Sequence, residues 1–441
     1  MMMLNKKNST LLLLGDYFIF ALSLLIALVI RGTDVSIWNS FKEHLVAFVF
    51  IFFAWSIVFF IAGLYDLQTK ILKDKLPSLI LNTQFINSGI AVLFFYLVPY
   101  FGIAPKTILF LDLLITFILV YVWRINSNII LGSQKKEPAI LIGSGEEMRD
   151  IFREVNENPK SELNFVMNVD LDKENDFSYI QNLLHKIKYE GVSVMVIDLS
   201  DKRIEPILPT LYRQIFSNIK FVGIDNVYEN LFNRIPLSFL QYEWFLQNIS
   251  ATHDVFYSLI KRLADIFSAV IIGVIFLVVL PFVVILIKIE DGGSIFYKNK
   301  RIGRNNGIIE ILKFRSMSEK EKEKITKIGM FLRKTRVDEL PQFLCLLLGD
   351  ISLIGPRPET PELVKVYEEE IPYYNIRHII KPGLSGWAQI YQENPPKYGV
   401  DFNNTKDKLS YDLYYLKNKS IMLDINIGLK TVKELISRRG K

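Results

Sequence analysis

The residues best suited to chemistry are two adjacent carboxylates, Asp338 and Glu339. Adjacent like charges repel one another, so the pair favours a divalent metal or an incoming phosphate as a compensating partner. Basic residues precede the pair, and two further segments with basic residues flank it: 313–317 (KFRSM) upstream and 355–358 (GPRP) downstream. Carboxylates flanked by cations that can bind phosphate are the groups that phosphoryl transfer requires.

The roles of the two carboxylates follow from their position. Pro341 indicates that a helix begins near Asp338, because proline is tolerated in a first turn and the apolar run 343–348 can continue as helix. Unpaired N–H groups there would keep Asp338 ionised, as a nucleophile, as an N-cap, or as both. Glu339 is expected to hold Mg²⁺ (or Mn²⁺), with Asp338 as a second ligand; the alternative is a first-turn glutamate that only satisfies the helix dipole.

Candidate substrate-binding residues surround the carboxylates in the sequence. Lys313 and Arg315 share one face if their segment is extended, which suits a diphosphate. Arg357 stands between two prolines in a rigid turn, so its guanidinium would lose little entropy on gripping phosphate. Arg301 and Asp412 are two further candidates. Surface charge is the alternative for the lysine and arginines, and core packing is the alternative for Asp412.

Composition limits the class of partner. The chain has 441 residues, a net charge of +6 and 50% hydrophobic residues. Its basic residues flank apolar segments, which favours membrane phospholipid and phosphorylated substrates over nucleic acid. A single cysteine, Cys345, excludes a disulfide framework within the chain, and four scattered histidines form no zinc or haem spacing.

Four apolar runs open the chain, at about 11–30, 44–64, 79–99 and 107–123, and each is long enough, or nearly so, to cross a hydrocarbon core of ~30 Å as a helix. Basic residues concentrate at the N-terminus, between the second and third runs (Lys70, Lys73, Lys75) and after the fourth. Because basic loops stay in the cytoplasm, we expect four transmembrane helices over 1–130, with the N-terminus and everything after residue 124 cytoplasmic.

Residues 137–250 alternate between apolar strand candidates and helical segments. The strand candidates are 138–142, 165–169, 192–198 and 219–224, a pattern typical of a parallel, doubly wound, Rossmann-like α/β domain. Gly143 and Gly145 begin a dinucleotide-binding motif, but Met148 replaces its third glycine. A structural or oligomerisation role, including a homodimer, is therefore favoured over nucleotide binding.

A fifth apolar run, about 263–289, contains Pro281 and has basic residues on both sides. A straight spanning helix would place one basic end outside the cell. Because proline removes a backbone hydrogen bond and kinks a helix, we predict a re-entrant membrane helix that breaks near Pro281 and returns; a conventional span is the alternative. The remaining residues, to 441, are expected to be mostly helical.

Five segments in this order resemble the bacterial sugar transferase family, the monotopic polyprenyl-phosphate glycosyl-1-phosphate transferases. They are 313–317, 338–342, 349–358, 382–389 and 411–415. The resemblance covers about 255–441, and four preceding membrane helices with a Rossmann-like domain are similar to the larger exopolysaccharide-type members. One departure concerns residues 390–395 (IYQENP), where the family often has an Asn-Gly-Arg segment.

The resemblance implies an enzyme of the bacterial inner membrane whose catalytic domain, 255–441, faces the cytoplasm. Asp338 matches the family nucleophile and Glu339 its partner at the Mg²⁺ site, while Lys313, Arg315 and Arg357 match positions associated with the diphosphate. The implied reaction transfers a sugar-1-phosphate from a UDP-sugar to polyprenyl (undecaprenyl) phosphate through a phosphosugar-aspartyl intermediate, for exopolysaccharide, capsule or O-antigen synthesis. The alternative is a non-enzymatic membrane sensor with a nucleotide-binding Rossmann-like domain.

Overall fold

The structure is a computed structural model, and the chain forms two compact units that are described separately. The first comprises Met1–Gly143, Met148–Val196 and Pro206–Phe221, and the second comprises Ser144–Glu147, Ile197–Glu205 and Val222–Lys441. The residues that the structure describes are 2–32, 36–62, 64–65, 72–98, 106–132, 136–158, 161, 163–173, 179–214, 219–249, 255–318, 324–396 and 399–437.

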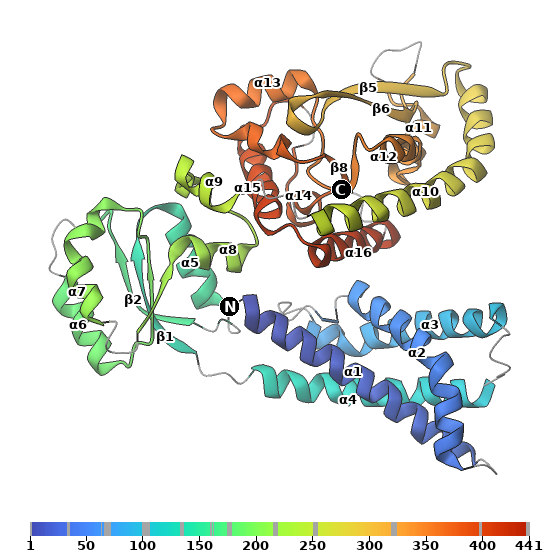
Figure 1. Ribbon diagram of the computed structural model, residues 1–441, viewed down its shortest axis with the longest axis horizontal. Coiled ribbons are helices and arrows are strands. Elements are labelled where there is room, and N and C mark those ends of the chain that lie inside the picture. Colours follow the sequence, from blue (N-terminus) through green and yellow to red (C-terminus); the bar gives the residue numbers. More distant parts are fainter. Residues whose placement is uncertain are drawn as a thin grey trace. The chain divides into compact units, whose positions relative to one another are not determined.

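Four long apolar helices open the first unit (Figure 1): α1 (Met2–Arg31), α2 (Ile37–Ile61), α3 (Leu72–Leu97) and α4 (Lys106–Gly132). Each is long and apolar enough to cross a membrane, as the sequence predicts. Their shared core is rich in aromatic rings; Phe20 packs edge-on against Trp55 with ring centroids 5.4 Å apart. Two of the basic residues that indicate orientation, Lys70 before the third helix and Lys135 after the fourth, lie outside the described residues.

Buried polar pairs join α1 to α4, and the pattern of apolar runs does not predict them. Arg124 donates to Asp16 at 2.5 Å, and Ser23 donates to Asp112 at 2.5 Å. All four side chains are nearly or completely inaccessible to solvent. Polar groups in a hydrocarbon layer are tolerated when they bond to one another, so these pairs select the packing of α1 against α4.

A four-stranded sheet follows, with β1 (Glu137–Gly143), β2 (Leu163–Asp170), β3 (Val194–Ile197) and β4 (Lys220–Gly223). The strand order is β2-β1-β3-β4, and β1 pairs with β2 in parallel. All four strands were predicted. The order is that of flavodoxin-like sheets, whereas the dinucleotide-binding Rossmann order would place β2 between β1 and β3 in a 3-2-1-4 arrangement. The parallel sheet therefore matches the expectation, and its strand order does not confirm the Rossmann-like detail.

Helices cover both faces of this sheet. Figure 1 shows α6 (Tyr179–Tyr189) and α7 (Leu208–Arg213) on one side and α5 (Gly145–Glu157) on the other. The short helix η2 (Lys202–Ile207) precedes α7. The turn from β1 into α5 uses Gly145 with φ of +83°, a conformation that side chains disfavour.

The second unit begins before the expected boundary at about residue 250. Its first elements are α8 (Ile224–Phe232), η4 (Leu237–Phe239) and α9 (Tyr242–Asn248). Ile235, between α8 and η4, is 1% exposed and packs in one core with Trp387 and Leu413, and its N–H donates to the Ser410 carbonyl at 3.1 Å. Residues 222–249 are thus part of the same compact unit as the chain that follows.

The rest of this unit is mostly helical, as expected, but it also contains two small sheets. The antiparallel pair is β5 (Phe296–Ile302) with β6 (Ile308–Phe314), and the parallel pair is β7 (Ser352–Ile354) with β8 (Gly383–Ser385). The helices are α10 (Val255–Glu290), η5 (Arg304–Asn306), α11 (Lys327–Lys334), η6 (Val337–Gln342), α12 (Phe343–Leu348), α13 (Pro361–Glu370), η7 (Tyr374–Ile379), α14 (Trp387–Tyr391), α15 (Phe402–Asn418) and α16 (Ile421–Ser437).

The helix α10 contains Pro281 and continues through it without a non-helical break. Figure 1 shows that α10 nevertheless changes direction along its length, and proline is a common cause of such a bend. The bend agrees with the predicted kink. The break in the helix that we expected at Pro281 is not observed, because the chain keeps helical geometry from Val255 to Glu290.

The start, the middle and the end of α10 each contact other elements of the second unit. Near its start, Lys261 pairs with Asp424 at 2.8 Å; in its middle, Gly273 lies against the Phe343 ring; at its end, Glu290 accepts from the Ile328 N–H at 3.2 Å. A straight helix of this length would extend ~54 Å, far beyond the ~30 Å hydrocarbon core. A conventional span would require the packed elements to cross that core too, so the contacts favour a helix that enters the bilayer from one side.

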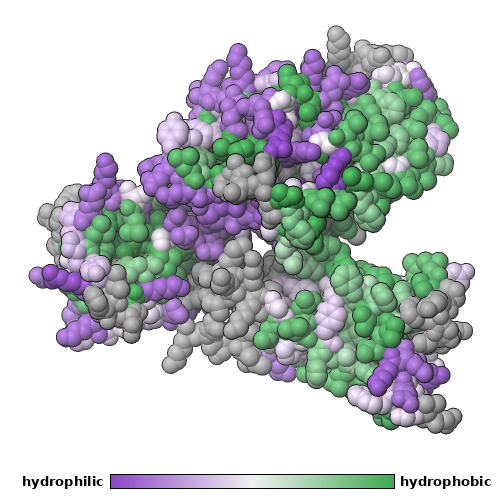
Figure 2. Space-filling view, in the orientation of Figure 1, coloured by the Kyte–Doolittle hydropathy of each residue, from purple (hydrophilic) through white to green (hydrophobic). Residues whose placement is uncertain are grey.

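The opposite face of α10 is apolar and exposed, and Figure 2 shows hydrophobic residues covering much of the helix. The exposed large side chains include Phe267, Val270, Val274, Leu277, Phe282 and Ile285. A continuous apolar surface of this kind on a packed helix is typical of a face that meets lipid.

Cysteine labelling in intact cells tests the side from which α10 enters. After Cys345→Ala, we expect Ser258→Cys in the first turn of the helix and Lys300→Cys after its end to react only with reagents that reach the cytoplasm, because both positions belong to one unit. Ser36→Cys, in the first loop, serves as the matched control and is expected to react from outside. Labelling of Ser258→Cys and Lys300→Cys from opposite sides would show that α10 spans the membrane.

Candidate active site

The two carboxylates lie on η6, which packs against β6. The chain enters η6 through Arg336, whose φ of 58° is left-handed, and this turn follows directly on α11. Lys313, near the end of β6, donates to Glu339 Oε1 at 2.8 Å. The hairpin and η6 therefore bring together the basic and acidic segments that are 26 residues apart in sequence.

Glu339 is the centre of a cluster of three cations. Besides Lys313, it pairs with Arg357 at 3.3 Å through Oε1 and with Arg336 at 3.5 Å through Oε2. Burial alone would raise the pKa of Glu339, but Arg357, Lys313 and Arg336 together outweigh it and lower the pKa to about 2. Glu339 is consequently ionised throughout the physiological range and keeps three cations gathered at one point.

Asp338 has a different environment from its neighbour. It is 7% exposed, and its Oδ1 has no hydrogen-bond partner among the residues that the structure describes. Burial, followed by the charge of Glu339, raises the pKa of Asp338 above its ordinary value, against the effect of Lys313, Arg333 and Arg336. A carboxylate oxygen without a donor keeps its lone pairs available for a reaction.

Burial acts on Asp338 against the expected effect of a helix start, because it raises the pKa, whereas unpaired N–H groups would favour the ionised carboxylate. The residue at the N-cap of η6 is Arg336, and no side chain caps this end. Asp338 lies inside a short 3₁₀ helix and makes no capping bond, so burial dominates over the helix dipole. Asp338 therefore does not cap this helix, and its role as a nucleophile stays a prediction.

Lys313 and Arg315 do not form the joint cationic face that was predicted. The strand β6 ends at Phe314, whose ring is buried between Phe276 and Phe296 at centroid distances of 5.6 and 5.4 Å. Beyond the strand, Arg315 is 9% exposed at its side chain and forms an ion pair with Asp291. Lys313 thus belongs to the cluster at Glu339, whereas Arg315 joins the end of α10 to β6.

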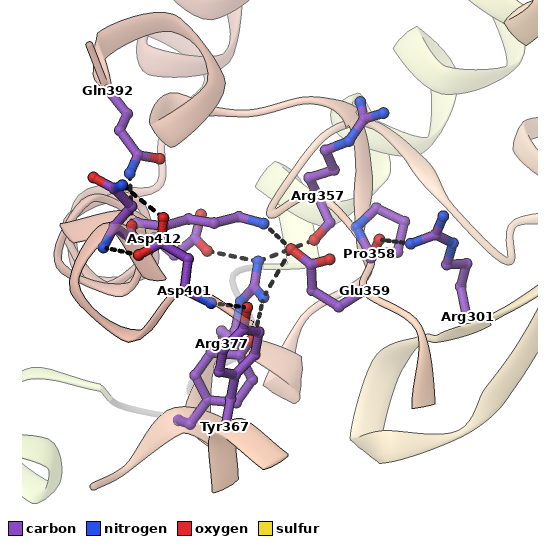
Figure 3. Close-up of polar contacts among 12 residues, drawn as sticks. Arg301, Arg357, Pro358, Glu359, Tyr367, Arg377, Gln392, Asp401 and Asp412 are labelled. Carbon is purple, nitrogen blue, oxygen red and sulfur yellow. Dashed lines mark hydrogen bonds and ion pairs between the residues drawn. The ribbon is translucent and has the colours of Figure 1, made fainter. Parts of the chain in front are cut away.

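Arg357 reaches Glu339 from the turn after β7, and its side chain is 38% exposed. Arg301, on β5, donates to the Pro358 carbonyl in this turn at 3.3 Å. Burial lowers the pKa of Arg301. Arg301 therefore supports the turn that carries Arg357, as the close-up in Figure 3 shows.

Asp412 lies inside the protein. It is 1% exposed on α15 and forms an ion pair with Arg377 at 2.7 Å (Figure 3). A side chain with almost no accessible surface does not contact a soluble substrate in this conformation. The geometry thus assigns Asp412 to the core, the alternative that the sequence left open.

Sequence reasoning noted Arg336 among the basic residues before Asp338 but gave it no role in the site. It missed Arg377, Glu359 and Lys408. Arg377 and Lys408 are buried and Glu359 is half-buried, and their partners are distant in the sequence. Apolar periodicity does not reveal buried ion pairs of this kind, so no local signal identifies them.

Comparison with known proteins finds relatives of the part of the chain that contains these residues. Residues 256–438 match the model of the bacterial sugar transferase family. The chain is 36% identical over 241 residues to a UDP-N-acetylgalactosamine-undecaprenyl-phosphate N-acetylgalactosaminephosphotransferase of Aeromonas hydrophila, which covers 52% of this chain and 55% of that protein. It is 35% identical over 186 residues to a UDP-glucose:undecaprenyl-phosphate glucose-1-phosphate transferase of Escherichia coli (strain K12), covering 40% and 39% of the two chains.

A shorter relative is matched over nearly its whole length. The exopolysaccharide production protein PSS of Rhizobium leguminosarum bv. phaseoli is 36% identical over 199 residues, which are 41% of this chain and 96% of that protein. The chain spans only about half, or less, of the two longer relatives. Because the match contains η6, β6 and the turn of Arg357 and covers a complete relative, the chain belongs to the bacterial sugar transferase family.

Proposed function

We propose that this protein transfers a sugar-1-phosphate from a UDP-sugar to polyprenyl (undecaprenyl) phosphate, an early membrane step in the synthesis of a surface polysaccharide. The observation that carries the proposal is Asp338, a buried carboxylate with an unpartnered oxygen beside a cluster of three cations at Glu339. The relatives named as undecaprenyl-phosphate sugar phosphotransferases support the same reaction class.

The reaction is written as two displacements at phosphorus. An oxygen of Asp338 attacks the phosphorus that bears the sugar, and the bond from that phosphorus to the bridging oxygen breaks, so that UMP leaves with the electron pair. The lipid phosphate oxygen then attacks the same phosphorus, and the aspartyl–phosphorus bond breaks to restore the carboxylate. The products are UMP and polyprenyl-diphosphate-sugar, and ping-pong kinetics follow from the two steps.

The charge of the site suits a diphosphate. Lys313, Arg336 and Arg357 face Asp338 and Glu339, which leaves one positive charge in excess before a substrate binds. The phosphate oxygens of the donor would compete with Glu339 for these cations and would be held by charge-assisted hydrogen bonds.

A divalent cation fits the same residues. Among the described residues there is no group of three potential metal ligands, but Mg²⁺ commonly uses only one or two carboxylates together with substrate phosphates. The unpartnered Oδ1 of Asp338 and the carboxylate of Glu339 would supply them. The bound cation, Mg²⁺ or Mn²⁺, would neutralise charge on the diphosphate.

The packing of η6 against α10 supports a location at the membrane surface. A helix that enters the bilayer from the cytoplasm would hold η6 at the membrane surface, because Phe343 at the end of η6 lies against Gly273 in the middle of α10. A water-soluble donor and a membrane-bound lipid phosphate could both reach Asp338 there. We place the catalytic domain on the cytoplasmic face of the bacterial inner membrane.

The identity of the released nucleotide tests the function. Purified full-length protein in detergent, with Mg²⁺, undecaprenyl phosphate and a panel of UDP-sugars, is expected to release UMP and to form a lipid with the mass of polyprenyl-diphosphate-sugar. Release of UDP would show transfer of the sugar without its phosphate and would overturn the proposal. Binding of a nucleotide without any product from the panel would favour the membrane sensor.

A further inference from the structure

A buried cluster of charges lies beneath the turn that carries Arg357. It consists of two cations, Arg377 and Lys408, and two carboxylates, Glu359 and Asp412 (Figure 3). Arg377 and Asp412 are each 1% exposed, and Lys408 is 6% exposed. Glu359 is 16% exposed at its side chain. Burying charges in this way is costly unless each of them is paired with an opposite charge.

Arg377 is the member that joins this cluster to the turn. Its Nη2 pairs with Asp412 at 2.7 Å and donates to the Arg357 carbonyl at 2.9 Å, while its Nη1 donates to the Tyr374 hydroxyl at 2.7 Å. One guanidinium therefore links α15, η7 and the turn after β7. The planar fork of arginine makes these contacts simultaneously, whereas a lysine has a single nitrogen.

The turn depends on its carbonyls for anchoring, because Pro356 and Pro358 have no N–H to donate. The Pro356 carbonyl accepts from the Gly383 N–H at 2.9 Å, and the Pro358 carbonyl accepts from Arg301 at 3.3 Å. The Arg357 carbonyl between them accepts from Arg377. Three successive carbonyls are thus held by donors from β8, β5 and η7. The Arg357 carbonyl accepts from the buried Arg377, whereas the Arg357 side chain reaches Glu339.

We infer that Arg377 is a positioning residue for Arg357: by holding the Arg357 carbonyl from inside the protein, it directs the Arg357 side chain to Glu339 and to the diphosphate. With 1% of its surface exposed, Arg377 does not touch a substrate. The expected change in kcat/KM rests on the proposed function. The expected loosening of the turn rests only on the contacts of Arg377.

A double-mutant cycle tests whether Arg377 acts through Arg357. Arg377→Lys is expected to lower kcat/KM about tenfold to a hundredfold, because a small misplacement of a substrate-binding group is costly. In an Arg357→Met background the same change is expected to cause less than a threefold further loss, since nothing remains to be positioned. Losses that multiply in the double variant, or no loss in Arg377→Lys, would overturn the inference.

A control variant and a hydrogen-exchange measurement complete the test, and the second of these does not depend on enzymatic activity. Arg304→Lys changes a nearby arginine that donates to the Ile379 carbonyl of η7 and not to the turn, and it is expected to leave kcat/KM unchanged. Hydrogen exchange in a peptide covering 350–362 is expected to rise in Arg377→Lys and not in Arg304→Lys. Unchanged exchange contradicts the positioning role even if the wild-type protein proves inactive, which would contradict only the proposed function.

A milder variant covers the case in which Arg377→Lys does not fold. Tyr374→Phe removes one hydrogen bond to the Arg377 guanidinium and leaves its charge and the ion pair with Asp412. We expect a smaller loss of kcat/KM that also disappears in the Arg357→Met background. A loss that persists in that background would overturn the inference.

Discussion

Asp338→Asn is expected to abolish formation of the lipid product, with a loss of at least roughly 10³-fold, because an amide cannot attack phosphorus as a carboxylate does. The substitution keeps the size of the side chain. It also removes a negative charge from a site that already has an excess of cations, so the UDP-sugar should still bind. The measurement is transfer of radiolabel from the UDP-sugar to lipid, with donor binding followed by thermal shift.

The control for this variant is Glu368→Gln, which makes the same acid-to-amide change on the exposed end of α13 and should leave transfer unchanged. Wild-type protein with donor alone should acquire label and release UMP, whereas Asp338→Asn should do neither. Normal transfer by Asp338→Asn would show that the lipid phosphate attacks the donor directly, without an aspartyl intermediate.

Asp412→Ala is expected to destabilise the second unit by about 3–5 kcal/mol, the usual cost of removing one partner from a buried ion pair. The Arg377 guanidinium would stay charged while only 1% of its side chain is exposed, and it would lose its nearest carboxylate. The measurement is the melting temperature of the purified protein in detergent, followed by intrinsic fluorescence.

Asp407→Ala is the matched control on the same helix. Asp407 is 54% exposed at its side chain and pairs with Arg234 at 3.0 Å, so its loss should cost at most about 1 kcal/mol. If Asp412→Ala instead melted like the wild type and bound the UDP-sugar more weakly, Asp412 would be a substrate contact, as the sequence suggested, and the structural assignment would fail.

The sequence predicted the elements whose signals are local. Four apolar runs became α1 to α4, the four strand candidates became β1 to β4, and the segment with Pro281 became the bent helix α10. Asp338 and Glu339 could also be singled out, since adjacent carboxylates beside basic segments are a local pattern. Lys313 and Arg357 were associated with them because both stand in basic segments that flank the pair, and both contact Glu339 in the structure.

The same reasoning failed where a side chain's role depends on a distant partner. Lys313 and Arg315 are alike in the sequence, yet β6 ends between them and directs one to Glu339 and the other to Asp291. Asp412 resembles an available carboxylate until its pairing with Arg377, 35 residues earlier in the chain, places it in the core. Local patterns contain no information about which residues meet across the fold.

The sequence by itself therefore determined the long apolar helices and the strands β1 to β4, because hydrophobic periodicity acts over short distances along the chain, and its motifs indicated the family. Only the tertiary structure decided the electrostatics of the site. It buried Asp338 and raised its pKa, gathered three cations at Glu339, and placed Arg377 behind Arg357. Burial and the partners of each charge depend on the path of the whole chain, and these two quantities set the reactivity of a carboxylate.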